Sequence, residues 1–188
     1  MALTLANKLT VFRFFLIPVF VWTVLCYSHD QDYLRFMAFG IFLFAILLDI
    51  FDGYVARKYH QETKIGSILD PLADKILLIS AYFCLYKIGA HFEIIRFPMW
   101  LVIAVISRDV LLLLGAVIIR LVNGDITVSP TGWGKATVFF ETIAAFGILL
   151  QWQNSSIIWP VVLVMVIISG YDYILKGIKE LNSGVKIS

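Results

Sequence analysis

The chain has 188 residues, of which 61% are hydrophobic and 15% are charged. A soluble globular domain has about 45–50% apolar and about 25% charged residues. The composition therefore excludes an ordinary soluble domain and predicts an integral membrane protein. The formal net charge of +2 says little by itself, and we expect no nucleic-acid partner.

Six apolar stretches are long enough to cross a bilayer, for which a helix needs about 20 residues. We predict an all-α integral membrane protein with six transmembrane helices, preceded by a short interfacial segment over residues 2–8. Little sequence remains for a soluble part, so we predict a single domain over residues 1–188. The Gly- and Pro-containing segment 123–134 is expected to be a turn. The six stretches are 9–27, 35–56, 66–88, 97–122, 136–153 and 156–175.

The basic residues are distributed unevenly over the expected connections. With six spans, ten Lys and Arg residues fall on the side of the two termini, and only Arg35, Lys87 and Arg96 fall on the other side. The positive-inside rule then predicts that both termini lie in the cytoplasm, as part of a multi-pass protein of the cell membrane. A basic cytoplasmic rim also attracts anionic lipid or a substrate that carries phosphate.

Four aspartates, Asp49, Asp52, Asp70 and Asp74, lie within or beside two of the apolar stretches. A carboxylate at membrane depth costs roughly 2.5–3.5 kcal/mol on insertion scales, so four of them require compensating positive charge. The first two are three residues apart and the last two are four apart, so each pair lines one face of its helix. Two antiparallel helices joined by a short cytoplasmic turn would bring both faces together.

Carboxylates that converge in a poorly hydrated site either take up protons or hold cations. Hard oxygen ligands favour Mg²⁺, Mn²⁺ or Ca²⁺, and two divalent ions suit chemistry on a phosphate ester or a pyrophosphate. Gly53 and Ala56 leave space beside the helix, Gly66 leaves space at the start of the next one, and Arg57 offers a bidentate phosphate contact. The alternative is that these are ordinary helix-end charges at the membrane interface.

This pattern resembles the complete signature of a known family, the CDP-alcohol phosphatidyltransferases: Asp49-x2-Asp52-Gly53-x2-Ala56-Arg57-x8-Gly66-x3-Asp70-x3-Asp74. Members transfer a phosphatidyl group from a CDP-linked lipid to an alcohol and release CMP. The resemblance implies that the four aspartates bind two divalent ions, Mg²⁺ or Mn²⁺, and that Asp74 is also the base for the acceptor hydroxyl. It further implies a homodimer, and contacts to the CDP-lipid from Gly53, Ala56, Arg57, Thr63 and Gly66.

Two further strings narrow the resemblance within the family. The opening Asn7-Lys-Leu-Thr10-x2-Arg13 and the string Leu69-Asp-Pro-Leu-Ala-Asp-Lys75 are similar to bacterial phosphatidylglycerophosphate synthases and to the related cardiolipin synthases. We predict that Asn7, Thr10 and Arg13 close the nucleotide site from the first span. The alternative for these three is a helix cap and an interfacial anchor.

Cationic residues beyond the aspartates bear on the choice of alcohol. Arg108 lies deep in the fourth stretch, where it is expensive without a partner, and its neighbour Asp109 points elsewhere on the helix. We predict that Arg108, Lys135 and Arg120 form a pocket for the phosphate of sn-glycerol 3-phosphate. The alternatives are snorkelling interfacial charges for Lys135 and Arg120, and for Arg108 a structural ion pair with Glu141 or Asp172.

The leading prediction is an enzyme at the cytoplasmic membrane face that makes phosphatidylglycerophosphate from CDP-diacylglycerol and sn-glycerol 3-phosphate. The alternatives within the family are a cardiolipin synthase and a phosphatidylinositol phosphate synthase. An alternative of another class is a small cation transporter, because intramembrane carboxylates also mark ion pathways. The motif carboxylates cluster at one expected level, which disfavours a pathway.

Overall fold

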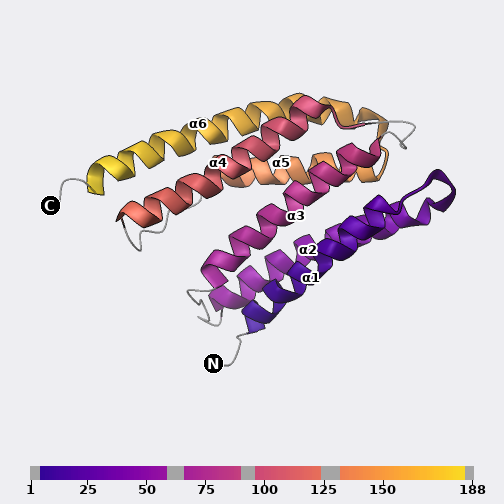
Figure 1. Cartoon of the computed structure of the whole chain (residues 1–188), viewed down its shortest axis with the longest axis horizontal. Helices are drawn as coiled ribbons and strands as arrows, with labels where there is room; N and C mark the ends of the chain where they lie inside the picture. Colours follow the sequence, from indigo (N-terminus) through magenta and orange to yellow (C-terminus); the bar gives the residue numbers. More distant parts are fainter. Residues whose placement is uncertain (1–4, 59–65, 90–95, 124–131, 185–188) are drawn as a thin grey trace. The chain divides into compact units, whose positions relative to one another are not determined.

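The computed structural model describes residues 5–58, 66–89, 96–123 and 132–184, and within them not the side chains of 5–8, 52, 54–58, 66–71, 88, 119–123 and 180–184. All regular secondary structure in these ranges is helical (Figure 1), so the predicted all-α class is confirmed. The elements are α1 (Leu5–Leu25), η1 (His29–Gln31), α2 (Tyr33–Lys58), α3 (Gly66–Ile88), α4 (Met99–Asn123), α5 (Gly132–Leu149), η3 (Gln153–Ile157) and α6 (Ile158–Gly184).

Each of the six α-helices in the described ranges overlaps one of the predicted apolar stretches, but several boundaries differ. Helix α1 runs from Leu5 to Leu25 where the stretch was 9–27, and α5 ends at Leu149 where the stretch ended at 153. Helix α5 begins at Gly132, so the prediction of a turn through residue 134 is wrong at its end. Glycine is tolerated there because the N–H groups of a first helical turn have no helical acceptor. Helix α6 continues to Gly184, with Lys176 and Lys179 exposed, because a helix can extend beyond its apolar part with a polar face toward water.

Three helices in the described ranges are apolar and long enough to cross a membrane: Tyr33–Phe51, Met99–Ile118 and Gln153–Lys179. A shorter apolar helix covers Leu9–Leu25. Large apolar side chains such as Phe15, Trp22 and Ile167 are exposed on these helices, as expected where lipid rather than water covers the surface. The protein is therefore a helical membrane protein.

The chain forms two compact units, which are described separately. The first consists of Met1–Phe97 together with Ala145–Trp152, and the second of Pro98–Ala144 together with Gln153–Ser188. The single domain predicted from the sequence stays a prediction.

In the first unit, α1 packs against both α2 and α3, the two helices that carry the aspartates. The buried residues of α1 recur at helical spacing and include Thr10, Arg13, Ile17 and Phe20. Phe20 packs on Phe42 of α2, with ring centroids 5.4 Å apart. Helices α1 and α2 are antiparallel neighbours with a short connection (Figure 1), so residues earlier in α1 meet residues later in α2.

In the second unit, α4 packs against α6, and both helices bury apolar residues such as Val105 and Val166. The Thr137 hydroxyl links α5 to α6 by donating to the carbonyl oxygen of Met165 at 3.1 Å. The Tyr173 hydroxyl links α6 to α4 by donating to the carbonyl oxygen of Leu112 at 2.9 Å. Apolar packing and bonds to backbone carbonyls thus hold this unit together.

Candidate functional site

Asp49 continues the buried face of α2. Leu34, Ala38, Phe42 and Ala45 are buried at spacings of three or four residues, and Asp49 follows one turn later. An antiparallel partner that places Phe20 against Phe42 brings a residue one to two turns earlier in α1 beside Asp49. The sequence thus folds so that a carboxylate emerges at the edge of the packed α1–α2 face.

Arg13 of α1 is the residue that meets Asp49. Its Nη1 lies 2.6 Å from Oδ1 of Asp49, and its side chain is 0% exposed, whereas that of Asp49 is 42% exposed. A buried guanidinium stays charged, so a buried carboxylate oxygen beside it is a favourable arrangement. The other side of the Asp49 carboxylate remains open.

Asp74 lies on the inner side of α3. Ala73, Leu77 and Leu78 around it are buried, and Asp74 itself is half-buried. Since α3 packs on α1, Asp49 and Asp74 both belong to helices that share α1 as a neighbour. The predicted helical spacing of both aspartate pairs is confirmed by the bounds of α2 and α3.

The remaining motif residues are only partly described. Gly53 is half-buried on α2, and Thr10 is buried on α1 one turn before Arg13. The convergence of all four carboxylates stays a prediction, because two of them are known only by their helix. The side chains of Asn7, Asp52, Ala56, Arg57, Gly66 and Asp70, and the whole of Thr63, lie outside the described residues.

The chemistry of the two described aspartates suits divalent cations of the hard class, and among the described residues no three His, Cys, Asp or Glu side chains lie together. Asp49 and Asp74 offer carboxylate oxygens, which Mg²⁺ and Mn²⁺ prefer, and neither side chain is fully buried. The pairing with Arg13 occupies one oxygen of Asp49, and a carboxylate has about four lone-pair sites on two oxygens. Asp49 can therefore bind a cation while it remains paired with Arg13.

The sequence interpretation placed Arg13 at the nucleotide and missed its contact with Asp49. A signal for this contact existed, because an arginine within an apolar stretch requires an anionic partner. What the sequence did not contain was the register of α1 on α2. The Phe20–Phe42 contact and the Arg13–Asp49 contact have the same register.

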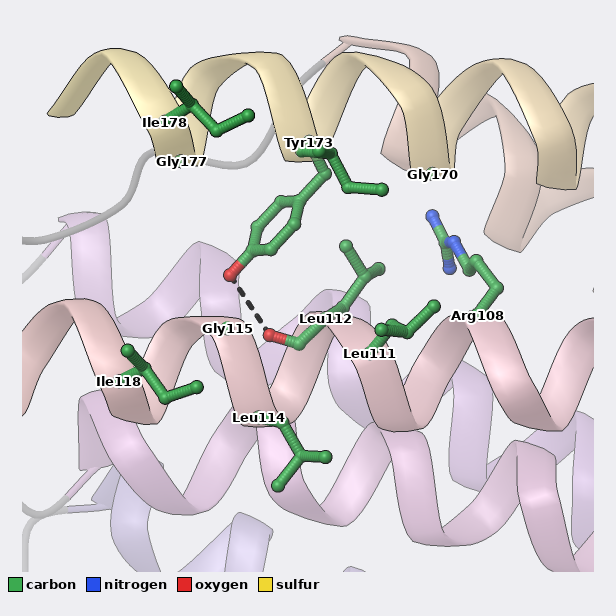
Figure 2. A pocket seen from close by; sticks show the side chains of 11 residues that line it. Arg108, Leu111, Leu112, Leu114, Gly115, Ile118, Gly170, Tyr173, Gly177 and Ile178 are labelled. Atoms are coloured by element: carbon green, nitrogen blue, oxygen red, sulfur yellow. Dashed lines mark hydrogen bonds between the residues drawn. The ribbon is translucent and has the colours of Figure 1, made fainter. Parts of the chain in front are cut away.

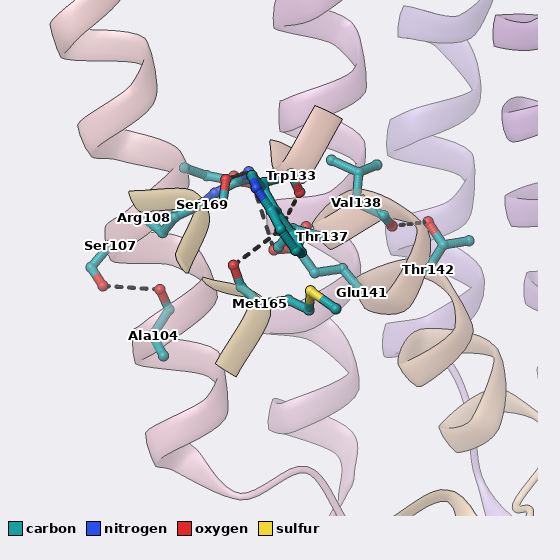
Figure 3. A network of polar contacts seen from close by, with 11 residues as sticks. Ala104, Ser107, Arg108, Trp133, Thr137, Val138, Glu141, Thr142, Met165 and Ser169 are labelled. Atoms are coloured by element: carbon teal, nitrogen blue, oxygen red, sulfur yellow. Dashed lines mark hydrogen bonds and ion pairs between the residues drawn. The ribbon is translucent and has the colours of Figure 1, made fainter. Parts of the chain in front are cut away.

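A second cluster of charges lies inside the second unit (Figure 3). Arg108 of α4 is 3% exposed and Glu141 of α5 is 0% exposed, with Nη1 and Oε1 3.9 Å apart. Arg108 Nη1 also lies 2.7 Å from Oδ1 of Asp109, and its Nη2 donates to the Ser169 hydroxyl at 2.6 Å. One guanidinium thus connects α4, α5 and α6.

This cluster bears on both interpretations of Arg108. The ion pair with Glu141, one of the structural alternatives, is present, whereas Asp172 instead pairs with Lys176 at 3.3 Å. Asp109 was not expected as a partner, because adjacent residues point in different directions from a helix. The long Arg108 side chain nevertheless reaches it. A phosphate contact by Arg108 stays a proposal.

Of the other two residues of the predicted phosphate pocket, the structure describes the side chain of Lys135 but not that of Arg120. Lys135 lies in the first turn of α5 with its side chain exposed. Arg120 belongs to the last turn of α4, but its side chain lies outside the described residues. An exposed lysine suits either a phosphate contact or the interfacial alternative.

An apolar groove of about 330 Å³ runs between α4 and α6, with Arg108 in its lining (Figure 2). It is bounded by α4 from Arg108 to Ile118 and by α6 from Gly170 to Ile178. Gly115 permits the close approach of Tyr173, whose ring carbon lies only 2.7 Å from where a Cβ would be. Hydrocarbon suits the lining away from Arg108, whereas an ionised phosphate does not.

The helices and their apolar surfaces define a membrane-embedded helical protein, and two partly exposed aspartates lie on α2 and α3. Comparison with known proteins gives the family. Residues 3–168 match the CDP-alcohol phosphatidyltransferase family, and the chain belongs to this family. The resemblance seen in the aspartate signature is thereby confirmed, and the protein is an enzyme of phospholipid biosynthesis, a phosphatidyltransferase.

Relatives match along most of the chain. A probable phosphatidylglycerophosphate synthase of Mycobacterium tuberculosis is 30% identical over 184 residues, which are 95% of this chain and 83% of the relative. A CDP-diacylglycerol–glycerol-3-phosphate 3-phosphatidyltransferase of Aquifex aeolicus is 31% identical over 181 residues, 92% of this chain and 95% of the relative. The Bacillus subtilis protein of the same name is 29% identical over 196 residues, 95% of this chain and 97% of the relative.

Proposed function

We propose that this enzyme transfers the phosphatidyl group of CDP-diacylglycerol to sn-glycerol 3-phosphate. The acceptor hydroxyl oxygen forms a bond to the phosphorus that carries diacylglycerol, the pyrophosphate bond breaks, and CMP leaves with the electron pair. The products are phosphatidylglycerophosphate and CMP. The observation that carries the proposal is the complete aspartate signature in a chain whose relatives are named for this reaction.

The donor site, in this proposal, lies at the ends of α2 and α3. Asp49, Asp52, Asp70 and Asp74 hold two Mg²⁺ or Mn²⁺ ions. When bound, these ions supply charge neutralisation of the pyrophosphate and of the departing CMP. Asp74 accepts the proton of the acceptor hydroxyl, for which it must be ionised and within hydrogen-bond reach. The CDP-lipid is bound by Gly53, Ala56, Arg57, Thr63 and Gly66, with Asn7 and Thr10 closing the site from α1.

The acceptor phosphate is assigned to Lys135, Arg120 and Arg108. Lys135 is exposed in the first turn of α5, where both its charge and the N–H groups of the helix end favour an anion. Arg108 already has carboxylate partners. It would therefore bind the phosphate through N–H groups that do not bond to Asp109, Glu141 or Ser169. A cationic pocket favours a small phosphorylated alcohol over a lipid acceptor.

The membrane arrangement is part of the same proposal. Six spans, with both termini and the aspartates on the cytoplasmic side of the cell membrane, satisfy the positive-inside rule and give the site access to water-soluble glycerol 3-phosphate. We further propose a homodimer. Membership of a phosphatidyltransferase family disfavours the cation transporter, while the cardiolipin and phosphatidylinositol phosphate synthases remain the alternatives within the family.

An acceptor panel tests the proposal. Purified protein is given CDP-diacylglycerol, Mg²⁺ and one acceptor at a time: sn-glycerol 3-phosphate, phosphatidylglycerol or inositol 1-phosphate. We expect CMP release and a new phospholipid with glycerol 3-phosphate alone, and none after chelation of the metal. Turnover with another acceptor and none with glycerol 3-phosphate would refute the assigned alcohol, and turnover unaffected by chelation would refute the metal site.

A further inference from the structure

Arg13, predicted from the sequence to help close the nucleotide site, is among the largest fully buried side chains of the described residues. It lies on the face of α1 that also buries Thr10, Ile17 and Phe20. Burying a guanidinium is costly unless charged and hydrogen-bonding partners compensate for the lost water. The carboxylate of Asp49 is one partner that compensates for this burial.

The exposure of the Arg13–Asp49 pair is unequal. The guanidinium is 0% exposed and the carboxylate is 42% exposed, and a short contact of 2.6 Å joins Nη1 to Oδ1. Arg13 thus holds the carboxylate from its buried side. A carboxylate contacted from its buried side in this way presents its remaining lone pairs outward.

We propose that Arg13 is a positioning residue for Asp49 as a metal ligand. The inference rests on the proposed function, because it takes Asp49 to be a ligand of the divalent ions. Groups that hydrogen-bond to a ligand from outside the coordination shell orient that ligand, and their loss typically weakens metal binding by 10–100-fold. Arg13 has this position relative to Asp49, because it contacts the carboxylate from α1, which packs on both aspartate-bearing helices, α2 and α3.

Two other roles for Arg13 make different predictions. If Arg13 served only to neutralise the carboxylates, its removal would strengthen metal binding, because a nearby positive charge repels a cation. If Arg13 served only to hold α1 to α2, its removal would lower stability and leave the affinity for the metal unchanged. The positioning role alone predicts weaker metal binding.

The affinity for Mn²⁺ alone separates these roles. Free Mn²⁺ is measured by electron paramagnetic resonance during titration of the detergent-purified full chain. We expect the Kd of Arg13→Gln to be raised by about 10–100-fold over wild type. The Kd of Arg13→Lys should be raised less, because lysine keeps the charge but not the planar fork of donors. Thermal unfolding without metal is recorded for each variant to establish that it is folded.

A matched control comes from the same unit. Arg35 also pairs with an aspartate, its Nη2 lying 2.7 Å from Oδ2 of Asp32, and it is 14 residues from Asp49, about 21 Å along α2. Arg35→Gln should leave the Mn²⁺ affinity unchanged. In an Asp49→Asn background, Arg13→Lys should also have no effect on the affinity, because the residue through which Arg13 acts is gone.

Each other outcome has a definite meaning. An unchanged or lower Kd for Arg13→Gln, with wild type binding Mn²⁺, overturns the positioning role and leaves the proposed function standing. If Arg13→Gln does not fold, Arg13→Lys alone and in the Asp49→Asn background decides in the same way. No Mn²⁺ binding by wild type refutes the metal site itself, and with it the inference.

Discussion

Two buried arginines, one in each unit, make closely similar contacts and yet define different kinds of site. Arg13 lies 2.6 Å from an oxygen of Asp49, and Arg108 lies 2.7 Å from an oxygen of Asp109. The difference is in the carboxylate, since Asp49 is 42% exposed and Asp109 is 0% exposed. The carboxylate of the first pair is open toward a ligand, and the carboxylate of the second pair is closed; we call them the open pair and the closed pair.

The physical consequence follows from desolvation. In a closed pair both ions have lost water, so each depends on the other and removal of one strands a buried charge. In an open pair the carboxylate retains access to water or to a cation, and the guanidinium fixes its position. Open pairs are therefore suited to binding, and closed pairs to linking helices.

The largest expected effect is on the reaction rate, from a change at Asp74, the proposed base in the first unit. Asp74→Asn keeps the size of the side chain but removes the proton acceptor, so we expect CMP release to fall by about 10²–10⁴-fold. The measurement is the initial rate with CDP-diacylglycerol and glycerol 3-phosphate, alongside the unfolding temperature. A folded Asp74→Asn protein with full turnover would remove Asp74 from the role of base.

Breaking the closed pair should mainly affect stability. Arg108→Met leaves the buried carboxylates of Asp109 and Glu141 without their guanidinium, which should cost about 3–5 kcal/mol. Lys176→Met is the matched control, because its partner Asp172 lies 3.3 Å away in a pair of which the lysine is half exposed, and it should cost about 0–1 kcal/mol. Thermal unfolding in detergent compares the two, and equal costs would contradict the distinction between closed and open pairs.

Within the second unit, two glycines allow the packing of α4 on α6 to be tested. A Cβ at Gly115 would lie 2.7 Å from a ring carbon of Tyr173, whereas a Cβ at Gly170 would meet nothing within 4 Å. Gly115→Ala should therefore destabilise the protein by about 1–3 kcal/mol. Gly170→Ala should be neutral or stabilising by about 0.5–1 kcal/mol. Unfolding temperatures in the opposite order would show that Tyr173 does not limit the approach of the helices.

The smallest effect is expected at a surface pair, Asp32 with Arg35. The hydrogen bond from Arg35 holds the pKa of Asp32 below its ordinary value, with further help from the Arg35 charge and from Tyr27. A lowered pKa in the folded state means stability that is present above the unfolded pKa of about 3.9 and is lost as the pH falls through the folded value.

Because the Asp32 side chain is 48% exposed, Asp32→Asn should lower the free energy of unfolding at pH 7 by less than about 1 kcal/mol. The difference in unfolding temperature between wild type and Asp32→Asn should shrink as the pH falls below about 3.9 and disappear once the pH is below the lowered pKa of Asp32. A difference that grows in acid would contradict the sign of this shift.

Much of the fold could be predicted from the sequence, because each long helix corresponds to an apolar stretch. The six stretches correspond to α1 through α6, and Gly66 is the first residue of α3, as its place before the apolar run indicated. The ends were less predictable. The start of α5 at Gly132 and the end of α6 at Gly184 depend on capping and on the interface more than on hydrophobicity.

The candidate site was predictable in its ligands and less so in its supporting residues. Asp49, Asp52, Asp70 and Asp74 stood out because carboxylates in apolar stretches are rare and their spacing is helical. Arg13 and Glu141 are each a single charge among apolar residues, and nothing local indicates which distant residue they meet. A pair between Arg108 and Asp109 was left open from the sequence, because adjacent residues point in different directions from a helix and the reach of the long arginine side chain depends on its surroundings.

The sequence by itself determined the class of protein, the helices and the residues that carry the chemistry, because composition, periodicity and motif spacing are properties of the chain. Only the tertiary structure decided which charges meet and how open each pair is. Arg13 reaches Asp49 because of the register between α1 and α2, and the packing of the second unit brings Arg108 within 3.9 Å of Glu141. Whether an ion pair binds a ligand or joins two helices depends on the water left around it, which the packing of the helices sets.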